Sequence, residues 1–355
     1  MTDIAAAVNV QPSALYRHFP SKDALLAETI RVSLQPLSDV LERTGDGPDD
    51  SFLDDLARAA IAQRTSGVLW QREARHLDAD TRAEVRDDLR RLSGRLTARL
   101  VAQRPELTSA KADQLAWSAM AALGSLAYHS LTLPDGQLET LVAAILRRIL
   151  NAPAPSASEP PDTAAGLHPQ SRRETILSAA SRLFSLHGYS TVTVDDIGDA
   201  VGIAGPSVYN HFPSKQDILV GIITRANEWL WMELTRALAA ATSPADALAR
   251  LGDSYLVLAT HRGELITALL TDLNHLSDDQ RHHFREAQHD YITEWVALLR
   301  RIRSTLDATA ARIEVQAALT VVNTTVQTPH LRRSDEGIPL LRATVTALLL
   351  PETST

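Results

Sequence analysis

Two lysines lie where a helix normally disfavours positive charge. Lys22 and Lys215 each follow a Pro-Ser pair and fall in the first turn of a predicted helix. The helix macrodipole disfavours a cation there by ~0.3–1 kcal/mol, and an external anion reverses the sign. A phosphate at this place also accepts hydrogen bonds from the N–H groups of the first turn. Both positions therefore suit contacts to a nucleic-acid backbone.

The sequence around each lysine is repeated. The pattern Asp-Ile-x-x-Ala-Val, followed by Tyr-x-His-Phe-Pro-Ser-Lys, starts at Asp3 and again at Asp196, an offset of 193. A second pattern, His-Leu-x-x-Asp-x-Arg, starts at His76 and again at His275, an offset of 199. Two matches in the same order predict an internal duplication. We therefore expect two copies of one unit, joined by the proline-rich linker 151–170.

The periodicity of apolar residues predicts an all-α fold. Apolar residues recur at i, i+3 and i+4, Gly totals only 15, and no convincing strand pattern occurs. In the second copy we expect helices over 172–187, from 194, 206–211, 214–239, 244–260, 264–272, 277–303, 308–325 and 336–349. In the first copy we expect helices over 21–43, 51–65, 68–76, 79–102, 109–131 and 137–150.

The elements before each lysine form a helix-turn-helix pattern. A short helix, a three-residue break and a second short helix precede the capped long helix. The breaks are residues 9–11 and 202–204. In this arrangement the second short helix enters the major groove of DNA.

Composition restricts the function classes. The formal charge is −8, so any DNA binding must be local rather than histone-like, and the absence of Cys excludes disulfides and thiolate sites. We find no signal peptide, no apolar stretch long enough for a membrane span and no catalytic motif. We expect a soluble cytoplasmic protein that is not an enzyme and needs no cofactor or metal.

The residues around Lys215 closely resemble the DNA-binding head of the tetracycline-repressor (TetR) family. The resemblance rests on Leu-Phe-x-x-His-Gly-Tyr from Leu183, Thr-Val-Thr from Thr191, and Ile-x-x-Ala-Val-Gly-Ile with Val-Tyr-x-His-Phe-x-x-Lys from Ile197. It implies all-α dimeric repressors with an N-terminal head and a helical bundle that dimerises and binds an inducing small molecule. On this basis the domains are residues 1–26 (a truncated head), 27–150 (bundle 1), 151–170 (linker), 171–219 (a complete head) and 220–351 (bundle 2).

The resemblance also implies which head residues touch DNA. In the second head, the positions that usually touch phosphates are Thr193, Tyr209, His211 and Lys215, and those that usually read base edges are Ala204, Gly205, Pro206, Ser207 and Asn210. The corresponding residues of the first head are Gln11, Pro12, Ser13, Ala14, Tyr16, Arg17, His18 and Lys22. Arg17 and Gln11 are better suited to hydrogen-bond base edges than their counterparts Asn210 and Ala204. We therefore expect the two half-sites of the DNA operator to differ in sequence.

The first head departs from the family pattern. Met1 aligns with Val194, so the first copy shows no counterpart of the helix at 172–187. Two explanations stay open: the true start lies upstream, or the first head is degenerate. Without that helix, Ile4, Val8, Leu15 and Phe19 lose a covering surface.

The bundles contain candidate pocket residues, for which core packing is the ordinary alternative. They are Trp70, His76, Trp117, Tyr128, Trp229, His275, Trp295 and Asn323. The function we predict is a transcriptional repressor released from operator DNA by an unknown small-molecule effector. It acts as an intramolecular pseudo-dimer or as a homodimer. The alternative is a ligand-binding or interaction protein of the same fold with lost or one-headed DNA binding.

Overall fold

The structure is all-α, as predicted. This computed structural model describes residues 1–43, 51–64, 77–134, 136–155, 171–332 and 337–350, and these residues contain no β-strand. None of the described helices is long and apolar enough to cross a membrane. The chain divides into two compact units, one with Met1–Ala154 and Gln316–Thr324, the other with Pro155–Val315 and Thr325–Thr355. The division gives Gln316–Thr324 to unit 1, whereas the sequence repeat assigns them to bundle 2.

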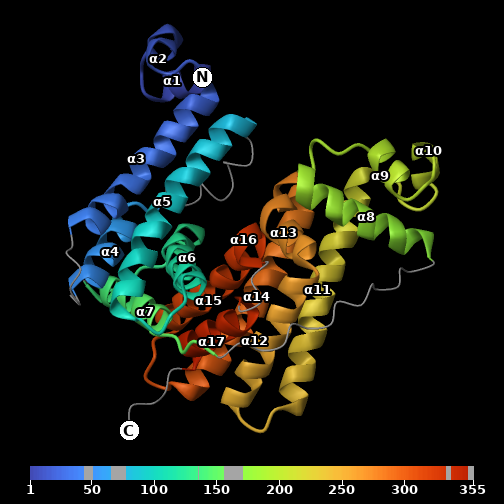
Figure 1. Cartoon of the computed structure of the whole chain (residues 1–355). Helices are drawn as coiled ribbons and strands as arrows, with labels where there is room; N and C mark the ends of the chain where they lie inside the picture. The colour runs from blue at the N-terminus through green and yellow to red at the C-terminus, as the bar shows by residue number, and fades with distance from the viewer. Residues whose placement is uncertain (44–50, 65–76, 135, 156–170, 333–336, 351–355) are drawn as a thin grey trace. The chain divides into compact units, whose positions relative to one another are not determined.

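Unit 1 places two short helices at the end of a long one (Figure 1). Its described elements are α1 (Thr2–Ala7), α2 (Pro12–His18), α3 (Lys22–Arg43), α4 (Ser51–Ala62), α5 (Ala79–Gln103), α6 (Ser109–Ser125), the 3₁₀ turn η3 (Leu126–Tyr128) and α7 (Gln137–Leu150). Helix α5 packs against α3 and α6, and α7 packs against α4 and α6. Their buried side chains form the core of bundle 1.

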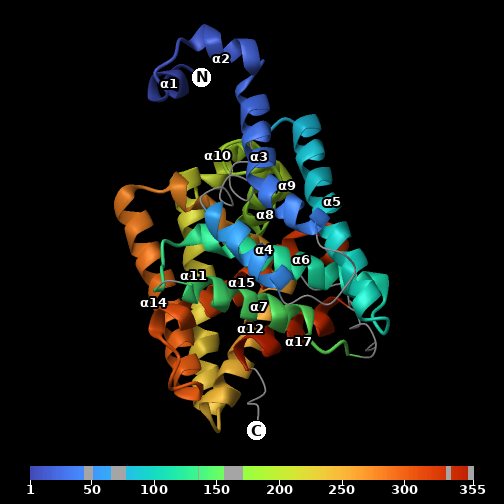
Figure 2. The ribbon, with the colours of Figure 1, turned by 90° about the vertical axis from the view of Figure 1, so that its left-hand side faces the viewer.

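Unit 2 begins with a helix, α8, before the two short helices of its head and has more described elements than unit 1. Its described elements are α8 (Arg172–His187), α9 (Val194–Ala200), α10 (Gly205–Val208), α11 (Lys215–Ala240), α12 (Pro244–His261), α13 (Gly263–Thr271), the 3₁₀ turn η4 (Asp272–His275), α14 (Asp278–Ile302), α15 (Ala308–Gln327), α16 (Pro329–Arg332) and α17 (Gly337–Leu349). Helices α11 and α14 lie side by side (Figures 1 and 2), and α12 packs against both.

Local capping explains why most boundaries were predictable. Ser214 accepts a hydrogen bond from the Asp217 N–H at the start of α11, and Ser277 forms a capping box with Gln280 at the start of α14. Helix α7 matches its predicted range of 137–150. The helix predicted over 68–76 lies outside the described residues.

Three helices end at least three residues before the sequence-based expectation. The helix expected over 109–131 ends at Ser125 and continues as a 3₁₀ turn. The recognition helix expected over 206–211 is α10, which ends at Val208. The helix expected over 51–65 is α4, which ends at Ala62. The short helix α16 at Pro329–Arg332 was not expected.

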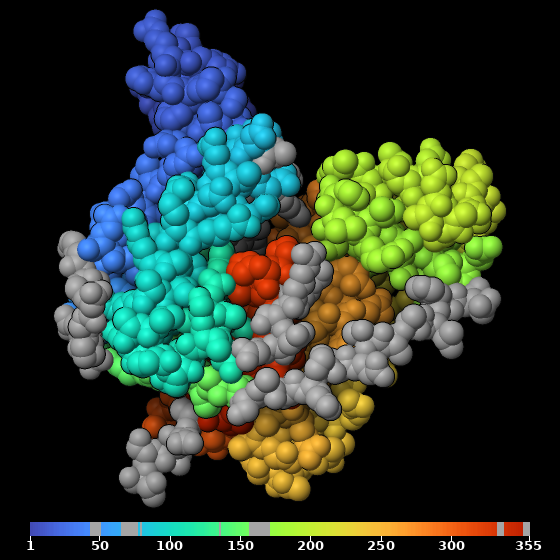
Figure 3. Space-filling model, viewed as in Figure 1, coloured from blue at the N-terminus to red at the C-terminus, as the bar shows by residue number. Residues whose placement is uncertain are grey.

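The two heads bury their apolar sides to different extents. In unit 2, Ile197 and Phe212 are at most 1% exposed, and α8 packs over α9 and α11. The equivalent residues of unit 1, Ile4 and Phe19, are only half-buried, and Val8 is 59% exposed. No described helix of unit 1 has the place that α8 has in unit 2, and α1 and α2 form a small lobe beyond the rest of that unit (Figure 3).

We expect the amide hydrogens of α1 and α2 to exchange with solvent faster than those of α9 and α10. Burying less apolar surface lowers the free energy needed to open a segment locally. Native-state hydrogen exchange read by mass spectrometry of the full chain measures both heads at once. Peptides from α6 and α7 provide a slowly exchanging control in unit 1. Equal protection of the two heads would contradict this account.

Candidate nucleic-acid interface

The turn between the two short helices has left-handed backbone geometry in both heads. Gly202 has φ 71° in unit 2, and Asn9 has φ 55° in unit 1. Glycine adopts this region without strain, and Asn tolerates it better than most residues. Both heads therefore make the same reversal of chain direction at equivalent positions.

In unit 2 the short helices approach closely because two glycines lie between them. A Cβ atom on Gly198 would lie 2.8 Å from the Ile203 carbonyl oxygen, and one on Gly205 would overlap the Asp195 carboxylate. The position equivalent to Gly198 in unit 1 is Ala5, which is fully buried. The two heads therefore do not share identical packing of the recognition helix.

Most residues predicted to face DNA in unit 2 lie on the outer surface of the head. Thr193, Ala204, Pro206, Tyr209, Asn210 and His211 are exposed, and Ser207 is half-buried. Gly205 differs from the expectation, since it is buried beside Asp195. Its structural role is to admit the close contact between α9 and α10, so it offers no surface to a base edge.

The predicted residues of unit 1 have the same placement. Gln11, Ser13, Tyr16, Arg17, His18 and Lys22 are exposed, whereas Pro12 and Ala14 are half-buried. Tyr16 is 55% exposed and its counterpart Tyr209 is 53% exposed. Each head thus presents a tyrosine hydroxyl and a histidine from the end of its recognition helix.

The Thr193 hydroxyl is already engaged within the head. It accepts a hydrogen bond from the Asp196 N–H and donates one to Asp196 Oδ2 at 2.7 Å. This hydrogen-bonded pair holds the pKa of Asp196 below its usual range. A phosphate that used the Thr193 hydroxyl would have to displace the Asp196 carboxylate from it.

The two lysines have different surroundings. Lys22 is exposed, whereas Lys215 is half-buried with its Nζ 4.2 Å from the centre of the Tyr189 ring and 5.9 Å from that of Phe184. Burial lowers the pKa of Lys215, and the Asp196 carboxylate opposes this effect. The Lys215 ammonium is therefore held against aromatic faces rather than extended into solvent.

Tyr189 connects the Lys215 ammonium to the bundle of unit 2. The Tyr189 ring stacks on His275 of η4 with 4.7 Å between ring centres. The next residue of α11, Gln216, donates a hydrogen bond to Gln280 of α14 at 2.9 Å. The start of α11 is thus joined to its own bundle directly through Gln216 and, by way of Tyr189, to His275.

Unit 1 has an equivalent connection. The Asp23 carboxylate accepts a hydrogen bond from the Asp78 N–H at 3.2 Å. Asp23 follows Lys22 as Gln216 follows Lys215, and Asp78 occupies the N-cap of α5 as Ser277 occupies that of α14. In both units the first turn of the long helix is therefore tied to the start of the same bundle helix.

Two arginines at the start of α8 were not among the predicted contacts. Arg172 donates to the Val201 carbonyl at 3.2 Å, and Arg173 donates to the His211 carbonyl at 2.9 Å while its guanidinium lies over the Phe212 ring. Both are exposed beside the recognition helix. The signal that singled out Lys215, a cation in the first turn of a helix, would also have found them.

The candidate pocket residues do not form one site. In unit 2, Trp295 is buried in the bundle, Trp229 lines a surface groove between α11 and α12, and His275 stacks on the head. In unit 1, Trp117 is buried and Tyr128 is partly exposed. Asn323 is buried in the part of α15 that the division into units gives to unit 1. Trp70 and His76 lie outside the described residues. No group of three or more His, Asp or Glu side chains in the described ranges is arranged to hold a metal ion.

The chain is similar to known bacterial regulators in both of its heads. The sequence profile described as "Bacterial regulatory proteins, tetR family" matches residues 1–29 and 176–222. The HTH-type transcriptional repressor KstR2 of Mycolicibacterium smegmatis is 31% identical over 140 residues, which cover 39% of this chain and 67% of that protein. The HTH-type transcriptional regulator LmrA of Bacillus subtilis is 27% identical over 161 residues, covering 44% of this chain and 82% of that protein.

A solved structure of a TetR-family transcriptional regulator from Bordetella parapertussis aligns with a TM-score of 0.47 and 23% identity, covering 51% of this chain and 95% of that one. The named relatives are transcriptional regulators rather than enzymes. From the profile matches in both heads and the identity to KstR2, we conclude that this chain belongs to the tetR family of bacterial regulatory proteins.

Proposed function

We propose that the chain is a ligand-responsive transcriptional repressor in which two fused TetR-like units supply two DNA-binding heads. Each exposed recognition helix, α2 or α10, enters a major groove, and Tyr16 and Tyr209 contact the phosphates beside it. The difference between Arg17 and Asn210 at equivalent positions supports an operator with two unequal half-sites.

The positions of the lysines in the chain are the main support for this proposal. The chain holds three lysines against 32 arginines, and two of the three, Lys22 and Lys215, occupy equivalent first-turn positions. A compact ammonium at the end of a flexible side chain suits a point contact to phosphate. The third, Lys111, lies in the first turn of α6 in bundle 1 and serves as an internal control.

Release from DNA follows from the contacts between each head and its own bundle. An effector that binds better to a bundle conformation incompatible with DNA shifts the population toward it. A preference of about 2 kcal/mol suffices for a roughly 30-fold change in DNA affinity. The Gln216–Gln280 and Asp23–Asp78 hydrogen bonds are the connections through which such a shift would move α11 and α3.

We expect DNA to protect Lys22 and Lys215, but not Lys111, from acetylation. The measurement is the acetylation rate of each lysine by mass spectrometry, with and without duplex DNA from the region upstream of the chain's own gene. In a parallel titration, Lys22→Ala should reduce the slope of log K against log salt concentration by about one, while Lys111→Ala leaves it unchanged. Equal acetylation of all three lysines in the presence of DNA would support the alternative of a protein that has lost DNA binding.

We expect Tyr189→Leu to tighten DNA binding by up to about fivefold. Removing the aromatic face releases the Lys215 ammonium from a contact that contributes about 0.5–1 kcal/mol. Tyr189→Phe keeps the ring and should bind DNA as the native chain does. Fluorescence anisotropy with labelled duplex measures the affinity, and thermal unfolding checks that both variants are folded. Weaker binding by a folded Tyr189→Leu variant would mean that the contact orders the head for DNA.

We expect a single chain to be the functional unit, because it already carries two heads. Light scattering in solution should then give a mass near the 38.7 kDa of one chain. Two chains together weigh about 77 kDa, and that mass would instead indicate a homodimer with four heads.

A further inference from the structure

The recognition helix of unit 2 starts with residues whose side chains cannot hydrogen-bond a base. Ala204, Gly205 and Pro206 carry no polar side-chain group, and the Ser207 that follows them is half-buried. In unit 1 the corresponding segment begins with Gln11, whose carboxamide is exposed. The start of α10 therefore contributes little base-reading chemistry of its own.

Asp195 of α9 places a carboxylate at this point of α10. A Cβ on Gly205 would lie 2.8 Å from the Asp195 Cγ and would overlap one of its carboxylate oxygens. The carboxylate thus occupies the place that a side chain at position 205 would take. Asp195 is exposed, and so are Ala204 and Pro206 on either side of Gly205. An acidic side chain from α9 therefore stands on the surface that the start of the recognition helix presents.

Unit 1 has neither half of this arrangement. By the repeat offset of 193, Asp195 corresponds to Thr2 and Gly205 to Pro12. Thr2 has no carboxylate, and Pro12 has the Cβ that Gly205 lacks. The two differences complement each other, because the glycine is found in the head whose carboxylate needs the space. The acidic group is thus a feature of the head of unit 2 alone.

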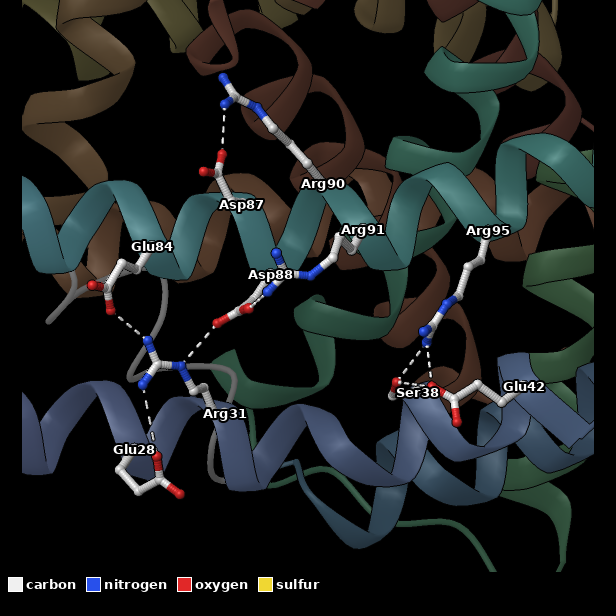
Figure 4. A network of polar contacts seen from close by, with 10 residues as sticks. All are labelled: Glu28, Arg31, Ser38, Glu42, Glu84, Asp87, Asp88, Arg90, Arg91 and Arg95. Carbon is white, nitrogen blue, oxygen red and sulfur yellow. Dashed lines mark hydrogen bonds and ion pairs between the residues drawn. The ribbon is translucent and has the colours of Figure 1, made fainter.

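The seam between α3 and α5 of unit 1 shows how this chain neutralises carboxylates between packed helices (Figure 4). Arg31 contacts Glu84 at 2.6 Å and Asp88 at 3.0 Å. Further along, Arg95 contacts Glu42 at 2.8 Å. Carboxylates of these two helices are therefore held by arginines of the neighbouring helix.

Asp195 has no such partner. Among the described residues its side chain makes no hydrogen bond and no ion pair. The two arginines at the start of α8, Arg172 and Arg173, donate instead to the carbonyl groups of Val201 and His211. The Asp195 carboxylate is therefore available to accept hydrogen bonds from a ligand of the head.

The capping of α9 does not use the Asp195 side chain. Thr193 and Asp196 form the capping box at the start of that helix. A carboxylate in the first turn also interacts favourably with the helix dipole. That role alone predicts a loss of stability on substitution, without a change in the DNA sequence that the head prefers.

Base edges differ in what they offer to a carboxylate. An ionised carboxylate only accepts hydrogen bonds. In the major groove, guanine presents two acceptors and thymine an acceptor and a methyl group, so both disfavour it. Cytosine presents a single amino donor, whereas the amino group of adenine lies beside the N7 acceptor. Cytosine is therefore the base that suits the Asp195 carboxylate best.

We propose that Asp195 reads a cytosine in the half-site bound by unit 2, by accepting a hydrogen bond from the amino group of that base. This assignment rests on the proposed function and names a base that the head of unit 2 selects. Thr2 cannot make this contact, so the cytosine preference belongs to one half of the operator.

Selection of random DNA duplexes by the full chain, followed by sequencing, tests this assignment. With the native chain we expect one position of the enriched sequence to prefer cytosine over every other base by about fivefold or more. Asp195→Asn adds an amide donor beside the remaining acceptor, a combination that suits adenine N6 and N7. The preference at that position should therefore move from cytosine to adenine, while the rest of the enriched sequence is kept.

Asp199→Asn is the matched control, since Asp199 is an exposed carboxylate one turn further along α9. Removing a negative charge from the head strengthens binding to all sequences alike, whereas losing a base contact changes their relative affinities. Asp199→Asn should therefore keep the cytosine preference. An unaltered preference in Asp195→Asn, or the same change in both variants, would overturn the assignment.

Gly205→Ala tests the geometry without removing the charge. The added Cβ takes the place of the carboxylate, so the Asp195 side chain must turn away and the cytosine preference should weaken. Hydrogen exchange of α9 and α10 checks that the head is folded. A folded Gly205→Ala variant with the native preference would also contradict the assignment.

Failure of this assignment and failure of the repressor proposal give different results. An enriched sequence that Asp195→Asn leaves unchanged overturns the role of Asp195 alone. If the native chain enriches no sequence at all, the repressor proposal is overturned, and the role of Asp195 with it.

Discussion

The close packing of α9 and α10 under α8 is the constraint on which the head of unit 2 depends. Gly198 and Gly205 let the two short helices approach to a distance that a Cβ atom would prevent. Helix α8 then covers Ile197 and Phe212, so the polar side of the recognition helix is left facing outward. Exposure of Tyr209, Asn210 and His211 is thus a consequence of how the opposite side is buried.

The two compact units differ in how their heads are buried and in the side chains of their bundle cores. Unit 1 has Arg17 and Gln11 where unit 2 has Asn210 and Ala204, on a head whose apolar side is only half-covered in the described residues. Unit 2 has a well-buried head and a bundle whose core contains polar aromatic residues.

Lys22 and Lys215 stand in the same sequence pattern but have different neighbouring groups in the structure. Lys22 extends into solvent, but Lys215 rests on Tyr189, which in turn stacks on His275. The Lys215 ammonium is thus linked through Tyr189 to the bundle of unit 2, and Lys22 has no such contact among the described residues.

The sequence by itself determined the all-α class and most helix boundaries, because these depend on local periodicity, capping residues and turn residues such as Gly202. It also indicated the exposed residues of α2 and α10, since the helix-turn-helix pattern fixes which positions face outward. Only the tertiary structure decided that Gly205 is buried, that Lys215 lies on Tyr189, and that Trp229, His275 and Trp295 belong to three different places. Those outcomes depend on which side chains distant in sequence meet, and the pattern of a single helix does not specify its neighbours.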